Sequence, residues 1–165
     1  RFGQISLPTE LTLKTTPLGL RLCMLPVKEI ENLYTRSEKA DALVLKPGAA
    51  NPLADLKGGL YDIDIVADLS EADQLVLRVR GNEIVVQADE TGLSIGETMK
   101  ISGTRKLHLR IVVDNTSQDV YFGQHGLYYS PLTPTPHPDK SLHLKVEGGT
   151  ATFNKLHVHE LKSIW

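Results

Sequence analysis

Cysteine, aromatic residues and net charge are all scarce in this chain, and each shortage excludes a class of structure or partner. A single cysteine, Cys23, rules out an internal disulfide and a zinc site built from several cysteines. The 18 basic and 20 acidic residues leave a net charge of −2, which argues against nucleic acid because phosphate binding needs clustered Lys and Arg. Aromatic residues make up only 5%, which disfavours a surface of stacked rings for binding sugars.

Long apolar runs are absent as well, so we expect no transmembrane segment and no membrane partner. The chain has 165 residues, 41% of them hydrophobic and 23% charged, as expected of one soluble globular domain. A chain of this length buries roughly 70% of its unfolded surface and needs no disulfide or metal for stability. It begins at Arg1 without a methionine, and we expect it to be a fragment or a processed product.

Hydrophobic residues recur with period two. Leu60–Ile65, Lys106–Ile111 and Ser141–Val146 alternate polar and apolar residues, which is typical of strands with one face on a core and one face in water. Further strands are expected at 10–14, 19–25, 42–45, 74–80, 83–87, 119–122, 126–129 and 151–160. We therefore predict an all-β fold over residues 1–165, a two-sheet antiparallel β-sandwich of about ten to twelve strands, jelly-roll or concanavalin-like.

Turn residues support this prediction. Arg80–Glu83 contains Gly and Asn between two strand-like runs and predicts a hairpin, and Glu147–Thr150 predicts a short connection between paired strands. Four prolines within 131–138 exclude that segment from a central strand, since proline lacks the donor N–H. Pro26–Leu33 has the pattern of one or two helical turns, or of an extended segment.

Some polar groups have the residue types of metal sites: Asp62 with Asp64, His157 with His159, and the acidic turn of Asp68, Glu71 and Asp73. Residues two apart on a strand point the same way. Each pair would need further ligands, however, and the acidic turn lacks the spacing of a calcium loop. We expect Asp62 and Asp64 to form a solvated strand face and His157 and His159 to be polar strand-face residues, and we predict no metal and no cofactor.

Three segments in order give a more specific signal. Ser6–Leu11 (SLPTEL) is followed by Gly19–Leu22 and then by Leu25–Glu31 (LPVKEIE). Leu107–Tyr121 reads LHLRIVVDNTSQDVY, and the chain ends with Leu156–Trp165, LHVHELKSIW. Together they resemble the C-terminal β-sandwich module of glycoside hydrolase family 32, the family of levanases, invertases and inulinases. Asp119 and Tyr121 stand where the family has Glu and Phe, so this is a divergent member.

The resemblance implies that the catalytic residues lie elsewhere. Family 32 chemistry belongs to a five-bladed propeller with Asn-Asp-Pro, Arg-Asp-Pro and Glu-Cys blocks. Here Asn51 precedes Pro52 directly, no Arg-Asp occurs, and Cys23 follows Leu22. We therefore expect no catalytic residue in this chain, which would act as an accessory module that supports or docks on the propeller of the same parent protein. Residues 1–9 would be the junction.

The resemblance also suggests where partners would bind. For the interface with the propeller the candidates are Phe2, Ile5, Leu7 and Trp165. The alternative function is a carbohydrate-binding module for levan or inulin, with candidates Tyr128, Tyr129, Asp119 and Tyr121 for sugar or partner contacts. Adjacent tyrosines on a strand point to opposite faces, so only one of Tyr128 and Tyr129 can be exposed while the other packs. Fructan and a second copy of the chain stay open as partners, and the family favours a secreted or periplasmic location.

Overall fold

The computed structural model describes residues 7–132 and 138–163, which form fourteen strands and one short 3₁₀ helix. The strands are β1 (Thr9–Thr16), β2 (Gly19–Pro26), β3 (Tyr34–Ala40), β4 (Leu43–Leu45), β5 (Tyr61–Glu71), β6 (Gln74–Val79), β7 (Asn82–Asp89), β8 (Gly92–Ile95), β9 (Met99–Ser102), β10 (Lys106–Val113), β11 (Gln118–Phe122), β12 (Tyr128–Leu132), β13 (Leu142–Glu147) and β14 (Thr150–Leu161). The 3₁₀ helix η1 spans Lys28–Leu33. No helix in these ranges is long and apolar enough to cross a membrane.

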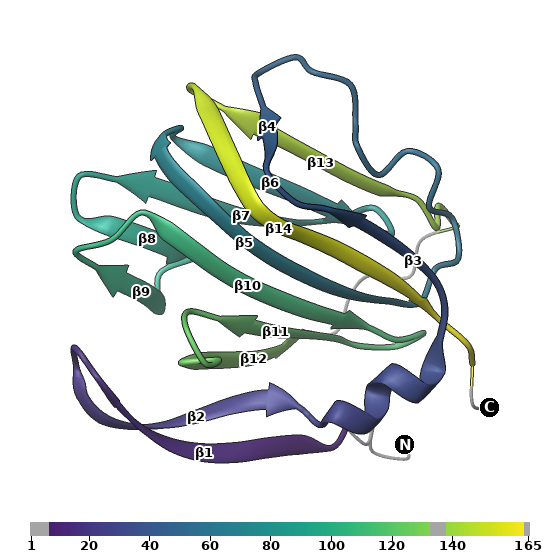
Figure 1. Ribbon diagram of the computed structural model, residues 1–165, viewed down its shortest axis with the longest axis horizontal. Coiled ribbons are helices and arrows are strands. Elements are labelled where there is room, and N and C mark those ends of the chain that lie inside the picture. The colour runs from purple at the N-terminus through teal and green to yellow at the C-terminus, as the bar shows by residue number, and fades with distance from the viewer. Residues whose placement is uncertain (1–6, 133–137, 164–165) are drawn as a thin grey trace.

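Two antiparallel sheets form the sandwich (Figure 1). The seven-stranded sheet has the order β12-β11-β10-β5-β14-β3, with β4 also paired to β14. The five-stranded sheet has the order β13-β6-β7-β8-β9. The predicted all-β, two-sheet antiparallel sandwich is confirmed, with more strands in the described part than the ten to twelve expected.

The alternating residues of both sheets meet in one core. Ile63 and Ile65 of β5 face Leu75 and Leu77 of β6, and each of these four side chains is fully buried. Burying a residue of this kind stabilises the fold by roughly 1.5–3 kcal/mol. Asp64, between the two isoleucines, and Val76, between the two leucines, point outward, so the period-two pattern of β5 predicted which side of that strand faces the core.

Three strands lie outside the predicted set: β3, β8 and β9. The outer strand β3 has the sequence YTRSEKA, and none of its side chains is fully buried. Backbone pairing with β14, from Leu156↔Ala40 to Leu161↔Tyr34, holds it in the sheet. Without a buried face such a strand has no apolar alternation. The short strands β8 and β9, with four residues each, give too few residues for a periodic signal.

The predicted hairpin at Arg80–Glu83 is confirmed, with a turn one residue earlier than its composition suggested. Arg80 and Gly81 both have positive φ, 49° and 75°, as a two-residue type I′ turn requires. Asn82 begins β7 instead, and its side-chain amide donates to the Arg80 carbonyl at 3.0 Å.

The prediction for Glu147–Thr150 was wrong about the strands it joins. β13 pairs with β6, and β14 pairs with β5, β3 and β4, so this connection crosses from one sheet to the other. Pro131 lies in β12, which among the described strands pairs with β11 at the edge of its sheet, a position that accepts proline. Of the segment Pro26–Leu33, only Lys28–Leu33 is helical, as the 3₁₀ helix η1, while Pro26 ends β2.

Gly149 in the crossing should tolerate no side chain. Its φ is +145°, and an added Cβ would overlap the backbone carbonyl of Glu71. We expect Gly149→Ala to lower the free energy of unfolding by about 3 kcal/mol. Gly48 is the control: its φ is +75° with nothing within 4 Å, so Gly48→Ala should cost only about 1 kcal/mol. Urea denaturation measures both, and equal losses would contradict the proposed overlap.

Candidate docking surface

Strands β1 and β2 form a two-stranded sheet of their own, which follows the lower edge of the molecule in Figure 1, below β11 and β12. The register pairs Leu13 with Leu22 and Thr15 with Leu20, and directly paired residues share a face. Four leucines of that face are exposed by 50–64%: Leu11, Leu13, Leu20 and Leu22, here called the leucine face. A contiguous apolar surface of this kind marks an interaction site.

The hairpin is attached at its base. The Met24 backbone N–H donates to the Gly126 carbonyl of the sandwich at 3.0 Å, while the bond from Val27 N–H to the Pro8 carbonyl, at 3.2 Å, closes the base of the hairpin itself. A second, smaller cluster lies on the outer face of the seven-stranded sheet, where Ile30 of η1 packs with Val112 and Tyr121. Figure 1 shows η1 between the hairpin and β3. The helix and hairpin base therefore cover part of this sheet.

The predicted interface residue Leu7 packs half-buried against this second cluster. Phe2, Ile5 and Trp165 lie outside the described residues. The leucine face was not among the predicted site residues, although its signal is visible in the sequence as Leu11/Leu13 and Leu20/Leu22. Alternation indicates an apolar face but does not tell whether the chain itself covers that face.

Tyr128 and Tyr129 point to opposite faces of β12, as predicted, and both are half-buried. Tyr128 packs against the main core beside Phe122, and its hydroxyl donates to the Lys100 carbonyl at 2.8 Å. Tyr129 packs with Tyr121 in the second cluster, and its hydroxyl donates to Asp119 Oδ1 at 2.8 Å. Both rings are thus engaged in packing within the domain.

The other two candidates for partner contacts, Asp119 and Tyr121, are each only 1% exposed. They lie inside the second cluster, so neither offers surface to a ligand of this chain. Burial raises the pKa of the Asp119 carboxyl, and the hydrogen bond from Tyr129 only partly offsets this. The described residues supply no hydrogen bond to Asp119 Oδ2.

Asp62 corrects the prediction of a solvated strand face. Its carboxylate is 0% exposed and accepts bonds from Arg110 Nε at 2.9 Å, Arg110 Nη2 at 2.7 Å and the Tyr34 hydroxyl at 2.6 Å. Burial and the bond to Asp62 raise the pKa of Tyr34. Burial opposes the charge on Arg110, but Asp62 more than offsets it and raises the pKa of the guanidinium. Asp64, two residues on, pairs with Lys155 at 2.9 Å and stays partly exposed.

The two histidines of β14 have different surroundings. His159 is only 8% exposed, and its ring stacks on Tyr34 with centroids 3.9 Å apart. Its Nδ1 lies 2.6 Å from Ser37 Oγ, and burial lowers its pKa. His157 Nε2 lies 2.9 Å from Asp41 Oδ1. Within residues 7–132 and 138–163, no three metal-ligating side chains gather into a site.

A cleft of about 600 Å³ separates the hairpin turn from the sandwich. Its walls come from Thr15–Leu18 on one side and from Ile101–Thr104, His108 and Gly123–His125 on the other. His125 has a positive φ of 61°, uncommon for a residue other than glycine. Because the two walls belong to different sheets, the width of the cleft depends on the position of the hairpin.

The contacts of Asp62 predict that its removal is costly. Asp62→Ala leaves the Arg110 guanidinium, which is only 21% exposed, without its partner, and we expect a loss of about 3 kcal/mol in the free energy of unfolding. Asp64→Ala, its neighbour on the same face, breaks a partly exposed ion pair and should cost less than about 1 kcal/mol. Chemical denaturation of both variants tests this, and similar losses would contradict the proposed role of the buried pair.

The raised pKa of Asp119 predicts a pH effect. The pKa of the Asp119 carboxyl is higher in the folded chain than its unfolded value of about 3.9. Its contribution to the free energy of unfolding is therefore fully present when the pH is below the unfolded pKa, and it is lost as the pH rises through the folded pKa. An asparagine side chain cannot ionise, so Asp119→Asn should gain stability relative to the parent chain between pH 4 and pH 7. Denaturation at both pH values measures this difference, and an unchanged difference would contradict the pKa direction.

Comparison with known proteins shows which family this chain resembles. No family model matches the chain. The levanase of Bacillus subtilis (strain 168) is 30% identical over 97% of this chain, which spans 27% of the levanase. An exo-inulinase of Aspergillus awamori shares the fold with a TM-score of 0.70 at 18% identity, over 97% of this chain and 36% of that structure. A glycoside hydrolase family 32 protein of Bifidobacterium adolescentis matches with a TM-score of 0.56 at 19% identity, over 97% of this chain and 26% of that structure. The resemblance to a β-sandwich domain of glycoside hydrolase family 32 is thereby confirmed.

Proposed function

We propose that this chain is the non-catalytic C-terminal β-sandwich module of a family 32 fructan or sucrose hydrolase, and that it docks on the catalytic propeller through the leucine face. The matched share of the relatives supports a module, because 27% of the levanase and 36% of the inulinase structure leave most of each protein for other parts. A catalytic domain is then the natural neighbour of residues 1–9, the proposed junction.

The leucine face carries this proposal. An isolated two-stranded hairpin is at best marginally stable in water, and this one leaves four leucines half or more exposed. The Lys14↔Arg21 pair lies on the opposite side of the same ribbon, so the apolar side chains are gathered on one side. Burial of that side against a second domain would remove it from water and support the hairpin at once.

The carboxylates of the described fold support a structural role as well. Retaining glycoside hydrolysis needs two carboxyl groups about 5 Å apart in an accessible site, one as nucleophile and one as acid/base. Asp62 is buried and paired with Arg110, and Asp64 is paired with Lys155. Asp119 is buried beneath Tyr129. These groups hold strands together, and hydrolysis would fall to the propeller.

Activity assays test whether hydrolysis belongs to the propeller and not to this chain. The purified 165-residue chain should release no fructose from levan, inulin or sucrose, whereas a product of the same gene that includes a propeller should release it. Fructose release is measured after incubation at equal molar concentrations. Release by the 165-residue chain alone would overturn the proposal, as would a longer gene product in which no propeller adjoins this module.

Two matched double variants test the docking surface. Leu13→Ala with Leu22→Ala removes one cross-strand pair of the leucine face, and Lys14→Ala with Arg21→Ala removes the next pair on the opposite side. In the chain alone both should change stability by less than about 1 kcal/mol. Joined to the propeller, the leucine variant should lose about 3 kcal/mol or more, because two leucines buried there are truncated. Equal losses for both variants in the joined protein would contradict docking through this face.

A further inference from the structure

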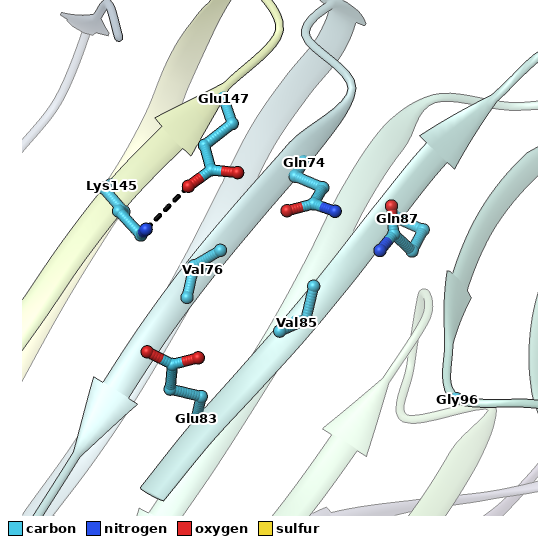
Figure 2. Close-up of a pocket in the computed structure, with 8 residues that line it drawn as sticks. All are labelled: Gln74, Val76, Glu83, Val85, Gln87, Gly96, Lys145 and Glu147. Atoms are coloured by element: carbon cyan, nitrogen blue, oxygen red, sulfur yellow. Dashed lines mark hydrogen bonds and ion pairs between the residues drawn. The ribbon is translucent and has the colours of Figure 1, made fainter. Parts of the chain in front are cut away.

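The outer face of the five-stranded sheet carries a hollow of about 480 Å³ (Figure 2). It lies over β13, β6 and β7, on the side of the sandwich away from the hairpin, η1 and the second cluster. A propeller docked on the leucine face would leave it accessible.

Strand register places the polar side chains of this hollow in a row. Glu147 of β13 is paired with Gln74 of β6, which is paired with Gln87 of β7, and Gln87 is paired with Ser94 of β8. With strands about 4.8 Å apart, the row from β13 to β7 is about 10 Å long. The row therefore presents hydrogen-bonding groups along a line, as an extended ligand requires.

Two valines form an apolar floor beside this row. Val76 and Val85 are paired across β6 and β7, and Figure 2 shows them between the glutamines at one end and Glu83 at the other. Val76 is only 4% exposed although it points to the outer face. An apolar floor flanked by a few polar groups is the usual composition of a ligand site.

The side chains leave free hydrogen-bonding capacity but little net charge. Among the described residues, nothing forms a hydrogen bond with the side-chain amide of Gln74 or Gln87. Glu147 is paired with Lys145 at 2.6 Å, and Glu83 is paired with Arg78 at 2.7 Å. Each amide offers two donors and an acceptor, and each carboxylate keeps acceptor capacity. This mixture suits hydroxyl groups, which donate and accept, better than it suits an anion or a cation.

We propose that this face binds a neutral oligosaccharide, with sugar hydroxyls on Gln74, Gln87 and the two glutamates and the C–H surface of a sugar ring on Val76 and Val85. The assignment of this oligosaccharide as a fructan chain rests on the proposed function. The module would then hold polymer on one sheet while the hairpin holds the propeller beside the other.

Titration of the ¹⁵N-labelled chain followed by NMR tests this site. The probes are a short levan oligosaccharide, a short inulin oligosaccharide and a malto-oligosaccharide of equal length as a neutral sugar of another class. We expect saturable shifts for a fructan probe at Gln74, Gln87 and their backbone neighbours. Gln74→Ala with Gln87→Ala should weaken the affinity about tenfold, since two hydrogen-bonding groups are lost.

Gln124→Ala is the matched control, an exposed glutamine that lines the cleft beside the hairpin. It should bind as the parent chain does, and the melting temperature of each variant checks that it is folded. Shifts that cluster at the cleft and vanish in the Gln124 variant would overturn the site. Absence of saturable shifts with all three sugars would overturn the inference and leave docking through the leucine face untouched.

Two further outcomes separate this inference from the proposed function. Binding of the malto-oligosaccharide alone would overturn the assignment to fructan and count against the proposed function. Shifts at this face that grow with protein concentration in the absence of sugar would assign it to a second copy of the chain and overturn sugar binding.

Discussion

The buried carboxylate of Asp62 is the interaction on which the outer side of the seven-stranded sheet depends. It holds Arg110 of the adjacent strand β10 and the Tyr34 hydroxyl at the start of β3, so one group joins three strands. Tyr34 in turn stacks on His159 of β14. A charge in such a position is stable only when its partners are in place. The correct placement of η1, which leads directly into Tyr34, is thereby coupled to the sheet that it covers.

This coupling explains why the domain has two apolar regions of unequal size. The main core lies between the sheets and follows from alternation alone. The second cluster lies outside the seven-stranded sheet and exists because η1 and the hairpin base fold back over Val112 and Tyr121. Polar and apolar groups meet there, and Asp119 and Asp62 are both enclosed by it. Within the part of the chain that the structure describes, the hairpin beyond this cluster has no comparable support from the sandwich.

Most of the sandwich could be predicted from the sequence, because a period of two fixes which side of β5, β10 and β13 faces inward. What the pattern could not give is what covers the outward side. Asp62 was expected in water for that reason, and it is buried by elements distant in the sequence. The outer strand β3 was not predicted, because backbone pairing with β14 does not require an alternation of polar and apolar side chains in its sequence. The family resemblance rested on motif order, which identifies the module but does not locate its surfaces.

The leucine face also bears on how the chain behaves when it is alone. Four half-exposed leucines on a narrow ribbon are as complementary to one another in two copies of the chain as to any other apolar surface. Without a second domain on this face, the chain would expose these leucines to water and tend to self-associate. Under the proposed docking, the side chains that hold the module on the propeller would be the same ones that make its release costly, which would favour keeping the two parts in one polypeptide.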